Sequence, residues 1–259
     1  MKTLIIGMGE VGRAHYDILS TTYPVSAYDI KTGWYHWGPG YLASTDKPAV
    51  GPFDIMHIAT PWLGDDFIPM VEGYAKERKP KIISVLTTVP PETCRRIEGK
   101  LGIPTVHSTT RGLHPNLVTG LLNIMKHVGG TRSKDVAAYF QAAGIRCRSH
   151  QQAVTTELAH QLINIDYAVA LAFADEKARI CRQFGVDYVE AVMTYTMSHN
   201  DGFTQLDHRS KCRPILTPPN GRIGGHCLVQ NAKMLAPILR DAGVSAPLVE
   251  MIEKYNDPK

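Results

Sequence analysis

Short apolar runs alternate with amphipathic stretches over the first half of this 259-residue chain. Such runs, rich in β-branched residues, are typical of buried strands, whereas apolar residues spaced three to four apart are typical of helices. We predict strands at residues 3–6, 25–28, 55–59, 81–86, 105–107, 126–128 and 145–149, and helices at 11–19, 67–75, 91–100 and 135–143. Strands joined by helices of this length form βαβ units, so the pattern indicates an α/β domain with a parallel sheet.

The second half has a different pattern, which begins with one long helical stretch over residues 156–184. Thr155 is a candidate N-cap and Gly185 a candidate stop. A helix of about 28 residues spans roughly 42 Å, which exceeds the width of a small domain, so we expect its apolar face to contact a partner subunit in a homodimer. We predict an α/β domain over residues 1–150 and an all-helical domain over residues 151–259.

A glycine-rich motif follows the first predicted strand and opens the first predicted helix. It consists of Gly7, Met8, Gly9, Glu10, Val11 and Gly12, which fit the G-x-G-x-x-G pattern. In this context the pattern is typical of a Rossmann turn that holds the pyrophosphate of a dinucleotide at a helix N-terminus. Asp29, at the end of the second strand, is placed to accept hydrogen bonds from the ribose hydroxyls and to favour NAD over NADP. Binding of another nucleotide is the alternative.

Two further segments are candidate contacts of the cofactor or the substrate. Ala59, Thr60 and Pro61 end the third predicted strand, where loops of such sheets face the cofactor. Gly224, Gly225, His226 and Cys227 precede a helical pattern in the second half. Two glycines allow close approach of a ligand, and a helix N-terminus favours the thiolate form of a cysteine.

Together these motifs resemble the UDP-glucose/GDP-mannose dehydrogenase family, in its branch with a Gly-Gly-His-Cys motif. The matching segments occur in the family's order: residues 7–12, 59–61, 87–91 (Thr-Thr-Val-Pro-Pro), 128–130 (Val-Gly-Gly), 157–159 (Glu-Leu-Ala) with Asn164, and 224–227. The resemblance implies oxidation of a primary alcohol to the acid with two NAD+. It implies that Cys227 is the covalent nucleophile, that Asn164 holds the oxyanion and that Thr88 contacts the cofactor and positions a water molecule.

The chain departs from the family at three chemically important positions. His160 replaces a lysine, Asn231 replaces an aspartate, and a glutamate expected near Thr109–Arg111 is missing. A histidine can stabilise an alkoxide only when protonated, or can serve instead as a general base. Two alternatives therefore stay open: a two-electron dehydrogenase or reductase that uses His160 without covalent catalysis, and an inactive NAD-binding partner or regulatory subunit. Relatives also continue into a C-terminal domain that binds the nucleotide part of the substrate.

Composition narrows the kinds of partner, cellular location and metal site that we expect for this chain. The net charge of +4 is dispersed, which argues against nucleic acid or a membrane surface as a partner and leaves a small-molecule substrate. We expect no signal peptide and no membrane span, because no apolar run is long enough. Five widely separated cysteines without a C-x-x-C pair indicate reduced thiols in the cytoplasm and no metal site. Arg111 is expected to be a solvated surface charge.

Overall fold

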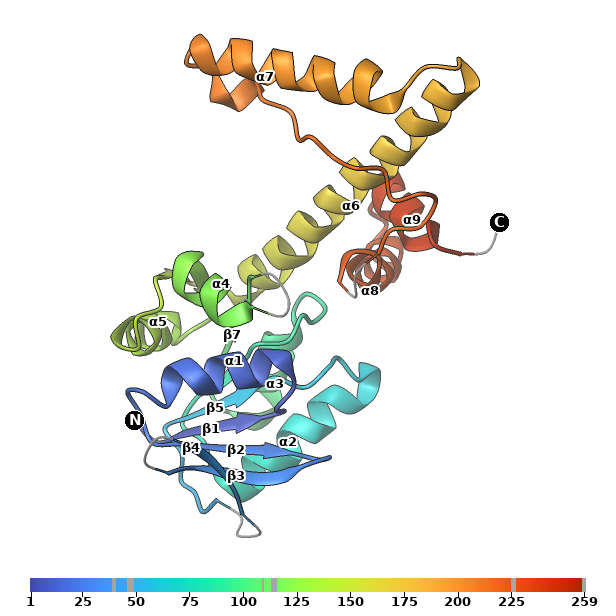
Figure 1. Cartoon of the computed structure of the whole chain (residues 1–259). Helices are drawn as coiled ribbons and strands as arrows, with labels where there is room; N and C mark the ends of the chain where they lie inside the picture. The colour runs from blue at the N-terminus through green and yellow to red at the C-terminus, as the bar shows by residue number, and fades with distance from the viewer. Residues whose placement is uncertain (39–40, 46–48, 109, 113–115, 225–226, 258–259) are drawn as a thin grey trace. The chain divides into compact units, whose positions relative to one another are not determined.

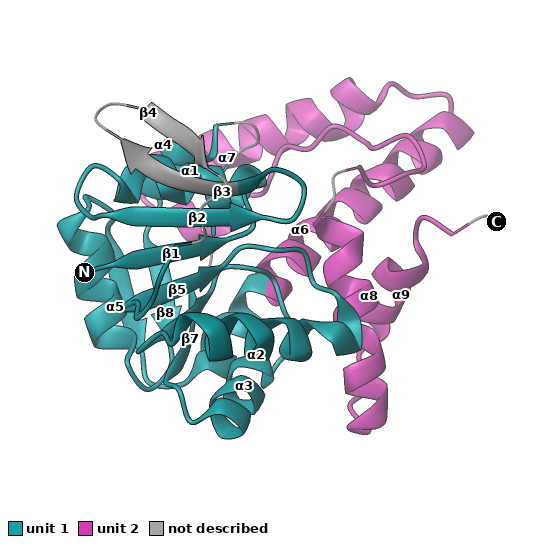
Figure 2. Cartoon of the chain, turned by 90° about the horizontal axis from the view of Figure 1, so that it is seen from below, with its two compact units in different colours: residues 1–160 teal, residues 161–259 magenta. Residues whose placement is uncertain are grey.

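The computed structural model describes residues 1–38, 41–45, 49–108, 110–112, 116–224 and 227–257, with the backbone alone for 34–38 and 41–45 (Figure 1). The chain forms two compact units, Met1–His160 and Gln161–Lys259 (Figure 2). The division falls within the long helix α6 (Ala153–Gln183), beyond the boundary at residue 150 expected from the change of pattern.

The first unit is built on one mostly parallel sheet. Its strand order over the described residues is β4-β3-β2-β1-β5-β6-β7-β8-β9. At its centre β1 (Thr3–Ile6) pairs in parallel with β2 (Val25–Asp29) on one side and β5 (Ile55–Ile58) on the other. From β1 the chain adds strands first on the β2 side of the sheet and then on the β5 side, so the strand order reverses at β1. Ligands of doubly wound sheets bind at such switch points. The predicted α/β fold class is confirmed.

Beyond the central strands the sheet continues with β6 (Ile83–Val85) and β7 (Thr105–Ser108), which are parallel, and with β8 (Lys126–Gly129), which is antiparallel to β7. The edge strand β9 (Cys147–His150) pairs in parallel with β8. A hairpin of β3 (Gly33–Gly38) and β4 (Tyr41–Thr45) extends the opposite edge beside β2. The sequence analysis missed this hairpin, although aromatic residues such as those at 34, 35 and 37 are good strand formers.

Helices cover both faces of the sheet (Figure 1). Side chains alternate along each strand, so Ile5 packs into one core while Leu4 and Ile6 pack into the other. The first core includes α1 (Glu10–Leu19), α4 (Leu117–Asn123) and α5 (Ser133–Ala142). The second core includes α2 (Phe67–Arg78), which directly follows the short turn η1 (Gly64–Asp66), and α3 (Thr93–Leu101).

The second unit is helical. After α6 come the π-helical turn η2 (Val189–Thr194), α7 (Tyr195–Gln205), the short η3 (Arg209–Lys211), α8 (Leu228–Asp241) and α9 (Pro247–Lys254). Helix α6 begins at Ala153, so Thr155 lies inside the helix and its prediction as the N-cap is wrong. Gly185 follows the helix with a φ of +66°, as expected for a glycine stop. Among the described residues, no helix combines the length and apolar character that a bilayer crossing requires.

Candidate functional site

The glycine turn after β1 packs against the end of β5. A Cβ atom on Gly7, whose φ is +95°, would lie 2.8 Å from the carbonyl group of Ala59, and a Cβ atom on Gly12 would lie 1.9 Å from the Gly7 carbonyl oxygen. Both positions therefore require glycine for packing. A Cβ atom on Gly9 would meet no atom of the described residues within 4 Å. The middle glycine thus faces open space at the start of α1, where a phosphate would be bound.

Asp29 lies beside this turn at the end of β2. Its Oδ2 accepts the Met8 N–H at 2.8 Å and its Oδ1 accepts the Lys31 N–H at 2.9 Å. Each carboxylate oxygen keeps further acceptor capacity, so the carboxylate can order the turn and still bind ribose hydroxyls. Across the turn, the Thr60 hydroxyl is buried with no hydrogen-bond partner among the described residues. The open Gly9 cradle and this orphaned hydroxyl both fit a dinucleotide cofactor.

Hydrogen bonds tie together the ends of three parallel strands next to the turn. The Thr87 hydroxyl donates to the carbonyl oxygens of Thr60 and, at 3.3 Å, Ile58. His107 Nε2 donates to the Thr87 carbonyl oxygen at 3.2 Å, and its Nδ1 accepts from the Thr156 hydroxyl at 3.0 Å. Burial lowers the pKa of His107 to about 3, so the ring is neutral, as this pattern requires. Half-buried Thr88 follows directly after this junction.

His160 lies on α6, close enough to His107 for its charge to affect the pKa of the His107 ring. Burial, then the positive charges of Arg111 and Lys126, lower the pKa of His160 to about 4. The imidazole is therefore neutral at physiological pH and can accept a proton, whereas the lysine of the family carries a charge. Near it at the end of β7, the hydroxyls of Ser108 and Thr110 are buried without hydrogen-bond partners among the described residues. Thr109 lies outside the described residues.

A lysine is buried behind the same end of β7. Lys126 Nζ lies 3.1 Å from His15 Nε2 and donates to the Ser108 carbonyl oxygen at 3.3 Å. It also lies 4.8 Å from the centre of the Phe140 ring. Desolvation lowers its pKa to about 7, because the charged form loses hydration that these neutral groups replace only in part. The sequence analysis assigned this lysine only to a strand.

Glu157, from the Glu-Leu-Ala motif, has a structural position. Its Oε2 accepts the Glu92 N–H at 2.7 Å and its Oε1 accepts the Cys94 N–H at 2.9 Å. The buried carboxylate therefore caps the N-terminus of α3, where two N–H groups would otherwise lack acceptors. This contact fixes the start of α6 against the β6–α3 connection and explains the motif without a chemical function.

The other candidates belong to the helical unit. Cys227 is exposed and immediately precedes α8. Asn231 is buried in the first turn of α8, and its Nδ2 donates to the Cys227 carbonyl oxygen at 2.6 Å, while its Oδ1 has no hydrogen-bond partner among the described residues. Asn164 is half-buried on α6, four residues after His160. Gly225 and His226 lie outside the described residues.

Comparisons with known proteins agree with these features. Residues 154–258 match the model of the central domain of the UDP-glucose/GDP-mannose dehydrogenase family. This match confirms the resemblance inferred from the motifs. The matched family is one of dehydrogenases, and the match is limited to residues 154–258. The sequence matches no curated protein.

Several solved structures share the fold. The chain is similar to a UDP-D-ManNAc dehydrogenase of Pyrococcus horikoshii, with 20% identity and a TM-score of 0.76 over 99% of this chain and 68% of that chain. A UDP-glucose dehydrogenase of Pyrobaculum islandicum shows 15% identity and a TM-score of 0.70, again over 99% and 68%. A 3-hydroxyisobutyrate dehydrogenase of Mycobacterium tuberculosis shows 14% identity and a TM-score of 0.69 over 98% and 92%. The chain thus spans about two thirds of these nucleotide-sugar enzymes and nearly all of the hydroxyacid enzyme.

Proposed function

We propose that this chain, whose residues 154–258 match the central domain of the UDP-glucose/GDP-mannose dehydrogenase family, oxidises a primary alcohol or an aldehyde toward the acid with NAD. A sugar or a nucleotide sugar is the proposed substrate class. The observation that carries the proposal is the turn after β1, where Gly7 and Gly12 are required by packing while Gly9 faces open space. A folded chain without a ligand has no packing need for glycine at position 9.

The turn, Asp29 and the end of β5 are the proposed cofactor contacts. The N-terminus of α1 has no side-chain cap and presents its first N–H groups to the pyrophosphate. Asp29 binds the ribose and repels a 2′-phosphate, and Thr60, with Ala59, Pro61 and Thr88 beside it, contacts the nicotinamide half. When bound, NAD+ supplies the acceptor for the hydride that leaves the substrate carbon.

His160 is the proposed general base. A pKa near 4 keeps the ring neutral at physiological pH and free to accept the hydroxyl proton as the substrate carbon is oxidised, and it makes the ring a weaker base than an ordinary histidine. Arg111 is the first charged neighbour to lower this pKa, and its guanidinium can hold an anionic group of the substrate. Ser108 and Thr110, at and just beyond the end of β7, offer hydroxyls that have no hydrogen-bond partner within the described parts of the chain.

Cys227 is the proposed nucleophile of the second oxidation. Its sulfur adds to the aldehyde carbon to form a thiohemiacetal, loss of hydride from that carbon gives a thioester, and water releases the acid and restores the thiol. Two NAD+ are reduced for each alcohol. Exposure of the thiol and its position at the start of α8 support this assignment. Asn164 is the proposed oxyanion donor, and Asn231 fixes the Cys227 carbonyl group.

A two-electron reaction without covalent catalysis is the second candidate. Asn231 cannot exchange a proton as the family's aspartate can, and neutral His160 cannot provide the charge of the family's lysine. In this reaction His160 moves the proton, one NADH forms for each alcohol, and the aldehyde or ketone is the product.

The two reactions are separated by counting NADH. We would first screen alcohols, sugars and nucleotide sugars with NAD+, then measure NADH formed per substrate consumed in the wild type, Cys227→Ala and the control Cys212→Ala. Two NADH per substrate, falling to one or fewer only in Cys227→Ala, supports the covalent reaction. One NADH in all three proteins supports the second candidate. Absence of turnover with every substrate contradicts both.

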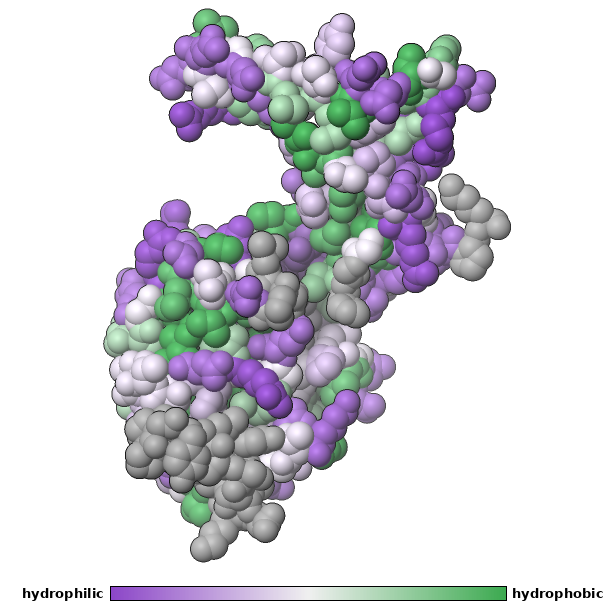
Figure 3. Space-filling view, viewed as in Figure 1, coloured by the Kyte–Doolittle hydropathy of each residue, from purple (hydrophilic) through white to green (hydrophobic). Residues whose placement is uncertain are grey.

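A homodimer through helix 156–184 is also proposed. Apolar side chains gather along the exposed side of α6 (Figure 3); Leu162, Tyr167 and Phe173 are each about half exposed. Phe173→Glu should yield a monomer by light scattering, whereas Leu206→Glu, at a 66% exposed position outside α6, should not. A wild-type monomer at micromolar concentration would refute the dimer. The five free thiols favour a reducing compartment such as the cytoplasm.

A further inference from the structure

The residues that the structure describes between η3 and Cys227 form no helix or strand. Residues 212–219 are irregular, and Pro214, Pro218 and Pro219 cannot donate backbone hydrogen bonds. Asn220 and Gly221 then turn the chain with positive φ values of +52° and +86°. Such a segment keeps one conformation only if side chains elsewhere bind its backbone groups.

Asn256, just beyond α9, makes one of these contacts. Its Oδ1 accepts the Ile223 N–H at 3.0 Å and its Nδ2 donates to the Ile223 carbonyl oxygen at 2.8 Å. The amide thus pairs with both backbone groups of one residue, as a neighbouring strand would. Ile223 is itself buried, at 1% exposure, and lies four residues before Cys227.

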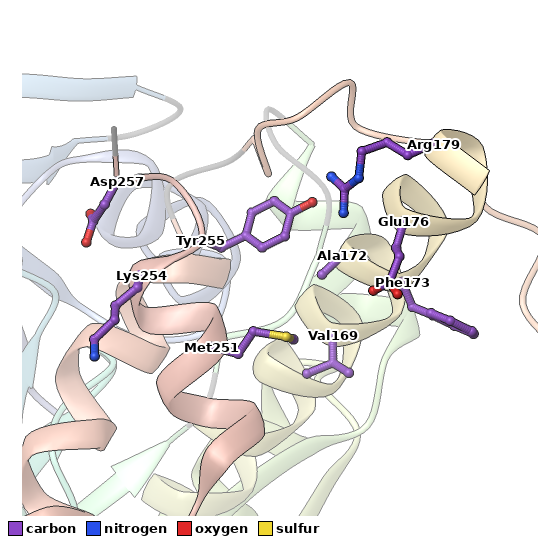
Figure 4. A pocket seen from close by; sticks show the side chains of 9 residues that line it. All are labelled: Val169, Ala172, Phe173, Glu176, Arg179, Met251, Lys254, Tyr255 and Asp257. Carbon is purple, nitrogen blue, oxygen red and sulfur yellow. The ribbon is translucent and has the colours of Figure 1, made fainter. Parts of the chain in front are cut away.

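Asp175, on α6, makes the second contact. Its Oδ1 accepts the Gly221 N–H at 3.0 Å, and its Oδ2 accepts the Tyr255 hydroxyl at 2.9 Å and Arg179 Nη1 at 2.6 Å. The Asp175 side chain is 2% exposed. In Figure 4 the Tyr255 hydroxyl points toward the Arg179 guanidinium, beside a cavity of about 650 Å³ lined by α6 and α9. Asp175 therefore joins α6, the end of α9 and the Gly221 turn.

We propose that Asn256 and Asp175 are positioning residues that set the location of the Cys227 thiol. They fix Gly221 and Ile223 before the cysteine, and Asn231 holds the Cys227 carbonyl group after it. The inference rests on the proposed nucleophilic function of Cys227, but its effect on the thiol can be measured without a substrate.

The same loop offers a matched control. Asn200, on α7, makes the same pair of hydrogen bonds to Arg213: its Oδ1 accepts the Arg213 N–H at 2.7 Å and its Nδ2 donates to the Arg213 carbonyl oxygen at 2.8 Å. Asn200→Ala and Asn256→Ala therefore remove equivalent contacts from one loop. Only Asn256 binds the part of the loop next to Cys227.

The experiment compares alkylation of Cys227 by iodoacetamide, followed by peptide mass spectrometry, in the wild type, Asn256→Ala, Asn256→Asp and Asn200→Ala. We expect both alanine variants to unfold at lower urea concentrations than the wild type, with the larger decrease in Asn256→Ala because its hydrogen bonds are partly buried and those of Asn200 are exposed. We expect the Cys227 alkylation rate to fall by up to about tenfold in Asn256→Ala alone, because the thiolate is the reactive form and moving the sulfur away from the start of α8 removes the helix N-terminus that favours it. Asn256→Asp keeps the acceptor for the Ile223 N–H and should change the rate less.

Equal alkylation rates in Asn256→Ala and Asn200→Ala would overturn the proposal. If Asn256→Ala does not fold, a wild-type rate in Asn256→Asp, together with its wild-type kcat on a substrate found in the screen, would overturn it as well. Failure of the covalent reaction itself would be seen separately, as full NADH stoichiometry in Cys227→Ala with an unchanged effect of Asn256 on the thiol.

Discussion

Replacement of buried Lys126 by methionine should stabilise the protein, and the gain should depend on pH. The lysine is 2% exposed and its pKa falls from 10.5 to about 7. At about 1.4 kcal/mol per pH unit, this difference corresponds to an upper bound of about 5 kcal/mol lost on folding at or below pH 7. Methionine fills a similar volume next to Phe140 and carries no charge to desolvate.

The substitution also removes two hydrogen bonds. His15 Nε2 and the Ser108 carbonyl oxygen lose the Lys126 donor, and each buried group left unpaired costs about 1–3 kcal/mol. We therefore expect Lys126→Met to raise the free energy of unfolding by up to about 3 kcal/mol at pH 6–7.

The pH dependence follows from the direction of the shift. Between pH 7 and about 10 the unfolded lysine is protonated and the folded one is not, so the wild type gains stability as pH rises, by about 1.4 kcal/mol per unit. Lys126→Met lacks this gain, and its advantage should shrink by about 2–3 kcal/mol from pH 7 to pH 9. Urea unfolding of both proteins at pH 6, 7, 8 and 9 measures this difference in the free energy of unfolding. Groups that titrate alike in both proteins cancel when the two values are subtracted. An advantage that is constant with pH, or a destabilised variant at pH 7, would refute the reasoning.

Three further predictions concern the first unit. Glu157→Ala leaves two N–H groups of α3 without acceptors and should lower the free energy of unfolding by about 2–5 kcal/mol in urea; a loss below 1 kcal/mol would show that the cap is dispensable. Glu92 has a φ of +71°, so Glu92→Gly should stabilise by up to about 1 kcal/mol in the same assay, and a clear loss would contradict the strain. Because the pKa of His160 is near 4, kcat/KM should not fall between pH 7.5 and 5.5 through this ring; a fall centred near 6.5 that His160→Gln abolishes would refute a neutral base.

The elements with strong local patterns could be predicted from the sequence. The apolar runs at β1, β5 and β7 and the Gly-x-Gly turn identify the Rossmann half, because hydrophobic alternation and glycine spacing are local properties. The long α6 was also predictable, but its start was not. Thr155 looks like a cap in sequence, whereas the neighbouring Thr156 bonds His107 and Ala153 from within the helix.

The site was predictable only in part, because its chemistry depends on contacts between distant residues. Nothing local marks Lys126 as buried beside His15, which lies 111 positions away. The neutral state of His160 depends on burial and on Arg111, which the sequence analysis treated as a surface charge. Likewise, Asn256 shows its contact with Ile223 only after the chain has folded.

The most direct test of the central claim is calorimetric titration of NAD+ and NADP+ into the wild type and Gly9→Ala. A methyl group at position 9 meets no atom within 4 Å in the part of the chain that the structure describes, so the variant should keep the wild-type Tm, whereas a bound pyrophosphate would contact the methyl group. The account predicts one NAD+ per chain in the wild type, weaker binding of NADP+ because of Asp29, and loss of NAD+ binding in Gly9→Ala. Absence of NAD+ binding in the wild type, or undiminished binding in the variant, would contradict a dinucleotide seated on this turn.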